Sequence, residues 1–340
     1  MRQILAWLAG AAIALQAATA VAAPEYPKLK LRMAHFLPAN FPGPIVDQWF
    51  ADEVKKRSGG NITIQIFWAG ALGRATEMLD MVSSGSVELA TANPGYFPNE
   101  MPLFSIFQGV PFVFDSHGQA VSVVHDLYQT NEALIDEMTR NRVKPIFWHG
   151  LDGYRPLCTK KIEKTADFQG RRMRGFGEYY PMMWSALKAS SVNVLPAELY
   201  EGLMRGTIDC AFWAYDSLHA GKLYEVAKFT TDIDFGAQVN YPLVVSLRHW
   251  DKWPQSVKDL FMEVGAEAMK QDNAIVTQKV KESRDDMINN HGVEEVVFTD
   301  QEALRAATPD ISKVWLENMV GRGLGDPAKE ILQAIDNAKQ

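Results

Sequence analysis

The stretch that decides the fold reads GRRMRG at residues 170–175 and ELYEGLMRGTID at residues 198–209. The two segments follow a strand, helix, strand pattern, which places Arg174 inside an α/β unit. An arginine stays ionised at every physiological pH, and its planar guanidinium meets a carboxylate with two parallel hydrogen bonds. The pattern therefore favours an organic acid as ligand.

The rest of the chain alternates strands with helices. Ile62, Ile64 and Ile66 are separated by polar residues, and this period of two is typical of a half-buried strand. Further strands are expected at residues 29–34, 87–91 and 144–149, and helices at about 44–57 and 75–84. The alternation predicts α/β layers with a mostly parallel sheet. In such sheets ligands bind beyond the carboxyl ends of the strands.

A long amphipathic helix is predicted from about Gln255 to Asn290. Pro254 opens it, and His291 with Gly292 closes it. At 1.5 Å per residue such a helix would be ~54 Å long, which is enough to run across two lobes. It would then tie the opening and closing of the lobes together.

The order and spacing of several short motifs resemble those of the solute receptors of tripartite ATP-independent periplasmic (TRAP) transporters. Besides the opening stretch, the motifs are LRMAH at 31–35, FADEV at 50–54, SGG at 58–60, GALG at 70–73 and LYEV at 223–226. The likeness covers nearly the whole chain after residue 23. It implies a two-lobed periplasmic-binding-protein fold, type II-like, with a long interdomain helix.

Two lobes also agree with the length of the chain, since single cores rarely exceed ~250–300 residues. The first lobe is expected to comprise residues 24–152 and about 236–278. The second lobe is expected to comprise residues 153–235 and about 279–340.

The N-terminus has the layout of a cleavable signal peptide over residues 1–23. Arg2 precedes an apolar run at residues 4–15, and small residues at 20–23 offer a cleavage site. A membrane anchor is the alternative, but the apolar run is shorter than the ~20 residues that a spanning helix needs. The mature protein is expected in the periplasm.

The chain is acidic overall, with 34 basic and 41 acidic residues and a net charge of −7. This balance argues against nucleic acid or an anionic membrane as partner, because both favour a basic surface. A monomer is the expected state, although a dimer remains open. Cys158 and Cys210 are the only cysteines. Spacing alone leaves a disulfide and two separate buried thiols as alternatives.

The resemblance assigns the carboxylate-binding position to Arg174. Strand alternation alone does not separate Arg174 from Arg172, because both would face the same side. The motif at 153–155, Gly-Tyr-Arg, resembles the second basic position of the family, so Arg155 is expected to assist. The alternative for Arg155 is an ion pair with an acidic neighbour.

Trp213 departs from the pattern of the family. Many members carry an asparagine there, and a subset binds a metal through a Glu-Trp pair at this position. Here Phe212 replaces that glutamate, so neither a metal nor another cofactor is expected. Successive strand residues face opposite ways, so core packing is expected for one of Phe212 and Trp213.

The far end of the ligand is expected to meet Phe36, Asn93, Tyr96 and Gln238, with Phe176 beside Arg174. Most of these side chains are aromatic, as is Trp213. They favour an aromatic or bulky apolar monocarboxylate, which would stack on the rings while arginine holds its acid group.

The predicted function is capture of an organic acid in the interlobe cleft and its delivery to the membrane subunits of a TRAP permease. No catalytic residues are predicted. The seven histidines form no His-x-x-x-His motif, and neither Gly-x-Ser-x-Gly nor Gly-x-Gly-x-x-Gly occurs. A periplasmic enzyme of similar two-lobed fold and a receptor that presents its ligand to a membrane sensor are the alternatives.

Overall fold

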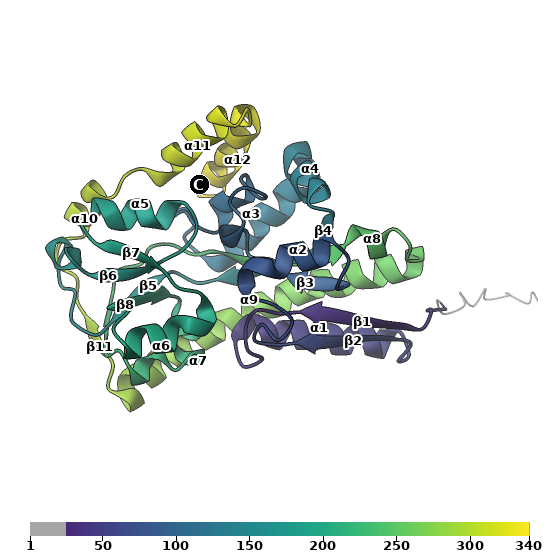
Figure 1. Cartoon of the computed structure of the whole chain (residues 1–340), viewed down its shortest axis with the longest axis horizontal. Helices are drawn as coiled ribbons and strands as arrows, with labels where there is room; N and C mark the ends of the chain where they lie inside the picture. Colours follow the sequence, from purple (N-terminus) through teal and green to yellow (C-terminus); the bar gives the residue numbers. More distant parts are fainter. Residues whose placement is uncertain (1–24, 340) are drawn as a thin grey trace, which may run out of the picture.

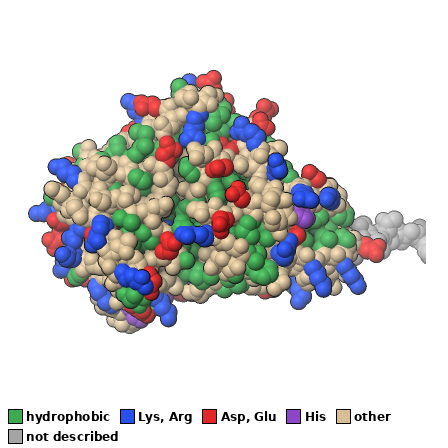
Figure 2. All heavy atoms as spheres, in the orientation of Figure 1, with side chains coloured by type: hydrophobic (Ala, Val, Ile, Leu, Met, Phe, Trp, Pro, Cys, Tyr) green, Lys and Arg blue, Asp and Glu red, His purple; other side chains and the backbone are tan. Residues whose placement is uncertain are grey.

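A computed structural model describes residues 25–339, which form two β-sheets with helices packed around them (Figure 1). The expected signal peptide at residues 1–23 lies outside the described residues. Figure 2 shows acidic and basic side chains interspersed over the face in view. Among the described residues, no helix is both long and apolar enough to cross a membrane.

The first sheet has the strand order β2-β1-β3-β10-β4. Its strands are β1 (Leu29–Ala34), β2 (Ile62–Phe67), β3 (Leu89–Thr91), β4 (Val143–Leu151) and β10 (Gln238–Ser246). The helices that connect or flank these strands are α1 (Pro42–Arg57), α2 (Met78–Ser83), α3 (His117–Thr130), α4 (Glu132–Arg140) and α8 (Leu247–Trp250). A short 3-10 turn at Ala75–Glu77 precedes α2, so the helix expected at 75–84 is divided in two.

The second sheet has the order β11-β9-β5-β8-β6-β7. Its strands are β5 (Arg155–Cys158), β6 (Arg172–Gly175), β7 (Ser190–Asn193), β8 (Cys210–Trp213), β9 (Phe229–Thr231) and β11 (Glu294–Val296). Helices α5 (Tyr179–Ala186), α6 (Leu199–Met204), α7 (Tyr215–Ala220) and α10 (Gln301–Ala307) lie along the same part of the chain.

Both sheets are mostly parallel, as expected, and each contains one strand that runs against the others. In the first sheet, β10 runs antiparallel to β3 and to β4. In the second, β5 runs antiparallel to β8 and to β9. The chain enters β5 and β10 by crossing from the other sheet, and no βαβ unit fixes the direction of these strands. Every residue of β10 is buried, so it lacks the alternation that marks a two-faced strand.

The last two helices bridge the two halves of the molecule. These are α11 (Ile311–Gly321) and α12 (Gly325–Asn337), and Figure 1 shows them above α5 and α3. The Trp315 indole donates to the Pro102 carbonyl at 3.1 Å, and α12 packs on α3 of the first sheet. Residues 294–307 instead lie beside the second sheet. The lobe boundary near the C-terminus stays a prediction.

Helix α9 (Gln255–His291) spans 37 residues and contacts α1 and β4 on one side and α7 on the other. Gly292 ends it in the left-handed conformation with φ 65°, where its N–H donates to Met287. Figure 1 shows α9 crossing behind the molecule from α8 toward α7. The predicted long interdomain helix is therefore confirmed, with both ends at the expected residues.

A buried ionic network fixes α9 to the first sheet. His149 of β4 lies between two carboxylates, with Nδ1 2.6 Å from Asp272 of α9 and Nε2 3.1 Å from Asp47 of α1. Asp272 also accepts from the Gly150 N–H at 2.7 Å. Burial by itself would lower the pKa of His149, but the two carboxylates outweigh burial and raise that pKa to about 10. The imidazolium thus holds three elements together.

Replacing His149 with Gln should destabilise the protein by about 3 kcal/mol, because it leaves two buried carboxylates without their cation. Because the pKa of His149 is higher in the folded state, His149 stabilises the fold fully at pH values below its unfolded-state pKa of ~6.5. That contribution is lost as the pH rises through about 10. Urea unfolding at pH 6 and pH 10 should therefore show that the difference in the free energy of unfolding between wild type and H149Q is smaller at pH 10. If this difference were the same at both pH values, His149 would not be charged in the folded protein.

Cys158 and Cys210 form a disulfide between β5 and β8, where they occupy directly opposite positions in the antiparallel ladder. The structure thus decides between the two alternatives that their spacing left open. The described residues contain no free cysteine. The bond fastens β8, the strand that ends at Trp213, to its neighbour.

Removing this bond in the C158A/C210A variant should lower the free energy of unfolding by about 4 kcal/mol, because the cross-link closes a loop with a sequence separation of 52 residues. Denaturant unfolding with and without dithiothreitol provides the measurement. Dithiothreitol should lower the stability of the wild type toward that of the variant and leave the variant unchanged. Equal stability of wild type and variant without the reductant would count against a stabilising role.

Candidate functional site

Arg174 is the buried cation at the centre of the candidate site. It lies on β6 with 1% of its surface exposed, and its Nη1 and Nε donate to the carbonyls of Phe212 at 2.8 Å and Val194 at 3.2 Å. Among residues 25–339, no carboxylate lies within ion-pair distance of its guanidinium. A buried charge requires an opposite charge, and arginine does not escape by losing its proton. The site is therefore prepared for an anion.

Arg172 shows why burial distinguishes the two arginines of this strand. It is exposed at the start of β6 and pairs with Asp209, its Nη2 lying 2.6 Å from Oδ1. The two side chains share the alternation of the strand, but Arg172 already has its counterion.

Aromatic rings enclose the guanidinium of Arg174. Its Cζ lies 4.8 Å from the ring centre of Phe176 and 4.9 Å from that of Trp213. These distances are typical of cation–π contacts. Phe212 instead packs among core rings, with Tyr154 and Trp184 each 4.9 Å away. One residue of the pair is thus a core residue, and the other faces the arginine.

Two further rings reach the site from the first sheet. Tyr96, after β3, lies 5.7 Å from Phe176 and 6.1 Å from Phe36, which follows β1. Desolvation raises the pKa of Tyr96 despite the opposing effect of the arginine charge, so its hydroxyl is neutral. A continuous row of rings therefore crosses from one sheet to the other.

Asn93 stabilises the turn that carries Tyr96. Its Oδ1 accepts from the Gly95 N–H at 2.8 Å and caps the turn at Pro94–Tyr96, while its Nδ2 donates to the Asn240 carbonyl at 2.8 Å. The observed contacts of this side chain are to backbone groups, and they position Tyr96.

Buried amides adjoin the rings. Gln238 donates its Nε2 to the Tyr180 hydroxyl, and Gln108 donates to the Tyr154 hydroxyl at 3.4 Å. The Oε1 atoms of both glutamines are buried and find no hydrogen-bond partner in the described part of the chain. Sequence reasoning missed Gln108, Tyr154 and Tyr180. Tyr154 had a signal, since it stands inside the Gly-Tyr-Arg motif, whereas Gln108 had none.

Arg155 is placed differently from Arg174. Its Nη2 lies 2.9 Å from Asp234 Oδ2, and its Cζ lies 5.0 Å from the Tyr215 ring centre. It is the cross-strand neighbour of Trp213. The acidic partner considered in the sequence analysis is thus present, and the Arg155 Nε is buried without a partner among the described residues.

A small cavity of about 210 Å³ marks the mouth of the site. It is lined on one side by Phe36, Ala69, Gly70, Arg74 and Ala75, and on the other side by residues 195–198. Arg74 and Glu198 form an exposed ion pair of 2.7 Å across it. At the rim, Gly177 has φ 64°, and a Cβ there would lie 3.0 Å from the Gly95 carbonyl oxygen. The two halves therefore meet backbone to backbone beside Tyr96.

The sequence profile of the bacterial extracellular solute-binding proteins, family 7, matches residues 33–319. The chain belongs to this family. The C4-dicarboxylate-binding periplasmic protein DctP of Vibrio cholerae is 27% identical over 78% of this chain and 76% of its own length. A solute-binding protein of Albidiferax ferrireducens is 28% identical, and the alignment spans 65% of each chain.

Solved structures share the fold. A TRAP periplasmic solute-binding protein of Chromohalobacter salexigens with bound D-glucuronate has a TM-score of 0.80 at 20% identity, covering 89% of this chain and 99% of that one. Another from Desulfovibrio salexigens, with bound orotic acid, has a TM-score of 0.79 at 22% identity, covering 91% and 98%. The expected two-lobed fold and the resemblance to TRAP receptors are confirmed.

The ion pair between Arg74 and Glu198 should make a small contribution to the closed state, because exposed pairs contribute ~0–1 kcal/mol. R74A and E198A should each speed dissociation of a bound solute by no more than ~5-fold, and the effect should shrink at high salt. Stopped-flow tryptophan fluorescence would measure the rate. The charge-swapped R74E/E198R variant is the control. Strictly additive effects of the two alanine changes in R74A/E198A would show that the residues do not act as a pair.

Proposed function

We propose that this receptor captures a monocarboxylate with an aromatic or bulky apolar body and delivers it to a TRAP permease. Arg174 is the carboxylate anchor in this proposal. The observation that carries it is the burial of a permanent positive charge with no carboxylate beside it among residues 25–339. Of the two arginines on β6, it alone lacks an anionic partner in the described chain.

The surroundings of Arg174 favour one carboxylate over two. The charge of Arg155 is already balanced by Asp234 at 2.9 Å, so the site has one uncompensated cation. A second carboxylate would lose its hydration without gaining a partner, which is costly in a buried site. We propose a secondary role for Arg155, through the Nε that lacks a partner in the described residues.

The body of the ligand is proposed to lie among Trp213, Phe176, Tyr96 and Phe36. Flat rings suit an aromatic or apolar skeleton, and the Tyr96 hydroxyl and the free amide oxygens of Gln108 and Gln238 would serve a small number of polar groups. The orotic acid bound by the Desulfovibrio salexigens protein joins one carboxyl group to a planar ring. The D-glucuronate of the Chromohalobacter salexigens protein is a sugar acid, which would need more hydrogen bonds than these rings offer.

The proposed cycle takes place in the periplasm. The acid enters the open cleft, Arg174 pairs with its carboxylate, and the first lobe closes so that Phe36 and Tyr96 cover the remainder. Desolvation of the ion pair and burial of the rings stabilise the closed form. The closed receptor then docks on the permease membrane subunits.

The ligand class and the anchor are tested in two steps. A thermal-shift screen compares benzoate-like, keto, hydroxy, dicarboxylic and sugar acids, because a ligand that binds only the folded state raises its melting temperature. Benzoate-like acids should give the largest shifts. Shifts confined to sugar acids or dicarboxylates would overturn the proposed ligand class.

Calorimetry on the best acid then compares three arginine variants. R174A should weaken binding by at least ~30-fold, the effect of losing a buried charged partner worth 2–5 kcal/mol. R155A should weaken it less. R172A is the matched control on the same strand and should bind like wild type, since Arg172 pairs with Asp209. Wild-type affinity in R174A would refute the anchor whichever acid binds.

A further inference from the structure

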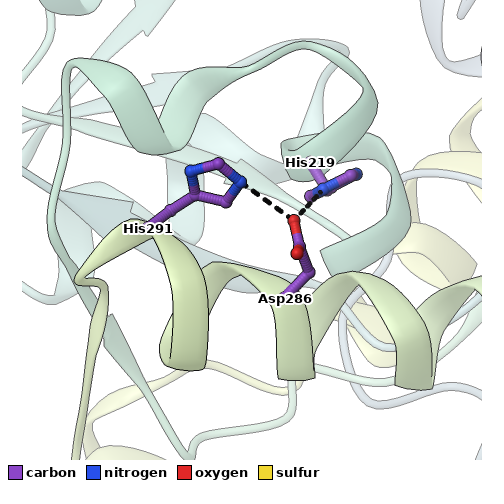
Figure 3. Close-up of side chains that lie close together, drawn as sticks. All are labelled: His219, Asp286 and His291. Atoms are coloured by element: carbon purple, nitrogen blue, oxygen red, sulfur yellow. Dashed lines mark hydrogen bonds and ion pairs between the residues drawn. The ribbon is translucent and has the colours of Figure 1, made fainter.

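His219, Asp286 and His291 gather on the second half of the molecule, on elements that the acid site does not use. His219 lies on α7, and Asp286 and His291 lie near the end of α9 (Figure 3). Both imidazoles point at one carboxylate oxygen. The Nε2 atoms of His219 and His291 lie 2.8 Å and 3.0 Å from Asp286 Oδ2.

These three groups have the composition and spacing of a transition-metal site. Two imidazoles and one carboxylate form a ligand set that Zn²⁺ commonly takes, with a fourth position left to water. One donor atom from each residue lies within 4.8 Å of the others. Zn–N and Zn–O bonds of ~2.0–2.2 Å place tetrahedral ligands about 3.3 Å apart. The two separations between imidazole nitrogen and carboxylate oxygen, 2.8 Å and 3.0 Å, need to open by only a few tenths of an ångström.

Neighbouring side chains hold the three ligands in orientation. Asn290 donates its Nδ2 to Asp286 Oδ1 at 2.8 Å, which leaves Oδ2 directed at the imidazoles. The Tyr224 ring stacks on His291 with centres 4.1 Å apart and lies 5.4 Å from His219. Supporting contacts of this kind fix ring and carboxylate orientation in known metal sites.

The environment admits both a cation and water. His219 and Asp286 border an open hollow of about 630 Å³ that is also lined by Lys279 and Lys281. Each lysine is paired, Lys279 with Glu282 at 2.9 Å and Lys281 with Asp285 at 3.4 Å. Their charges are therefore balanced locally, and Asp286 remains the carboxylate nearest the imidazoles.

We propose that His219, Asp286 and His291 form a Zn²⁺ site whose remaining coordination position is open to solvent. A metal there would join the last turn of α9 to α7. It is a structural site, separate from Arg174 on β6, so it should stabilise the fold without changing the affinity for the acid.

The test uses the full protein after treatment with EDTA, titrated with ZnCl₂ alone in a calorimeter. One equivalent of Zn²⁺ should bind and raise the melting temperature. H219Q, H291Q and D286N should each weaken this binding by more than ~10-fold, and N290A by about 10-fold, the usual effect of losing a supporting contact. H125Q is the control, because His125 lies on α3 outside the cluster. Circular dichroism confirms that each variant is folded.

Cobalt provides a second readout. Co²⁺ bound by wild-type protein should give the strong visible absorption of a four-coordinate ion, and H219Q/H291Q should not. Zn²⁺ affinity unchanged in the folded H219Q/H291Q variant, or no binding by wild type, would overturn the site. The affinity for the acid should be equal with and without Zn²⁺. A large difference would contradict the proposal that the metal site is independent of the acid site.

Discussion

The structure of this receptor depends on one electrostatic constraint, a permanent positive charge that is buried without an anionic partner among residues 25–339. Two backbone carbonyls and two aromatic faces hold the Arg174 guanidinium in place. These groups moderate the cost of burial but do not neutralise the charge. In the proposed function, binding of an acid would supply the missing negative charge. The fold provides the rigid frame that such a site needs.

Two interactions stabilise that frame, a buried ionic network and a disulfide bond. In the first half, the His149 imidazolium joins β4, α1 and α9 through Asp47 and Asp272. In the second half, the Cys158–Cys210 bond fixes β5 to the start of β8, the strand that ends at Trp213. Helix α9 contacts elements of both halves. A movement of one lobe would therefore act on the helix that packs against the other lobe. The rings that meet between the lobes are then the groups free to respond to a ligand.

Local signals in the sequence predicted the features with local causes. Pro254 and Gly292 mark the two ends of α9 because a proline opens and a left-handed glycine closes a helix. Arg174 was separated from Arg172 only by resemblance, since the counterion Asp209 is distant in sequence. The direction of β10, the pairing of the cysteines and the position of Gln108 depend on long-range register and packing. No short window of sequence encodes these contacts.

The contact between Gly177 and Gly95 would give the proposed closing movement a fixed end point. Backbone meets backbone there, and a Cβ at Gly177 would lie 3.0 Å from the opposing carbonyl oxygen, so these two residues have no side chain that could yield. The distance between Arg174 and the rings of the first lobe is then set by the protein and not by its guest. A solute that is too long would prevent the contact between Gly177 and Gly95 from forming, and a shorter one would leave space between the solute and the rings. If the lobes close as proposed, the glycine pair would limit the length of the ligand that the closed site accepts.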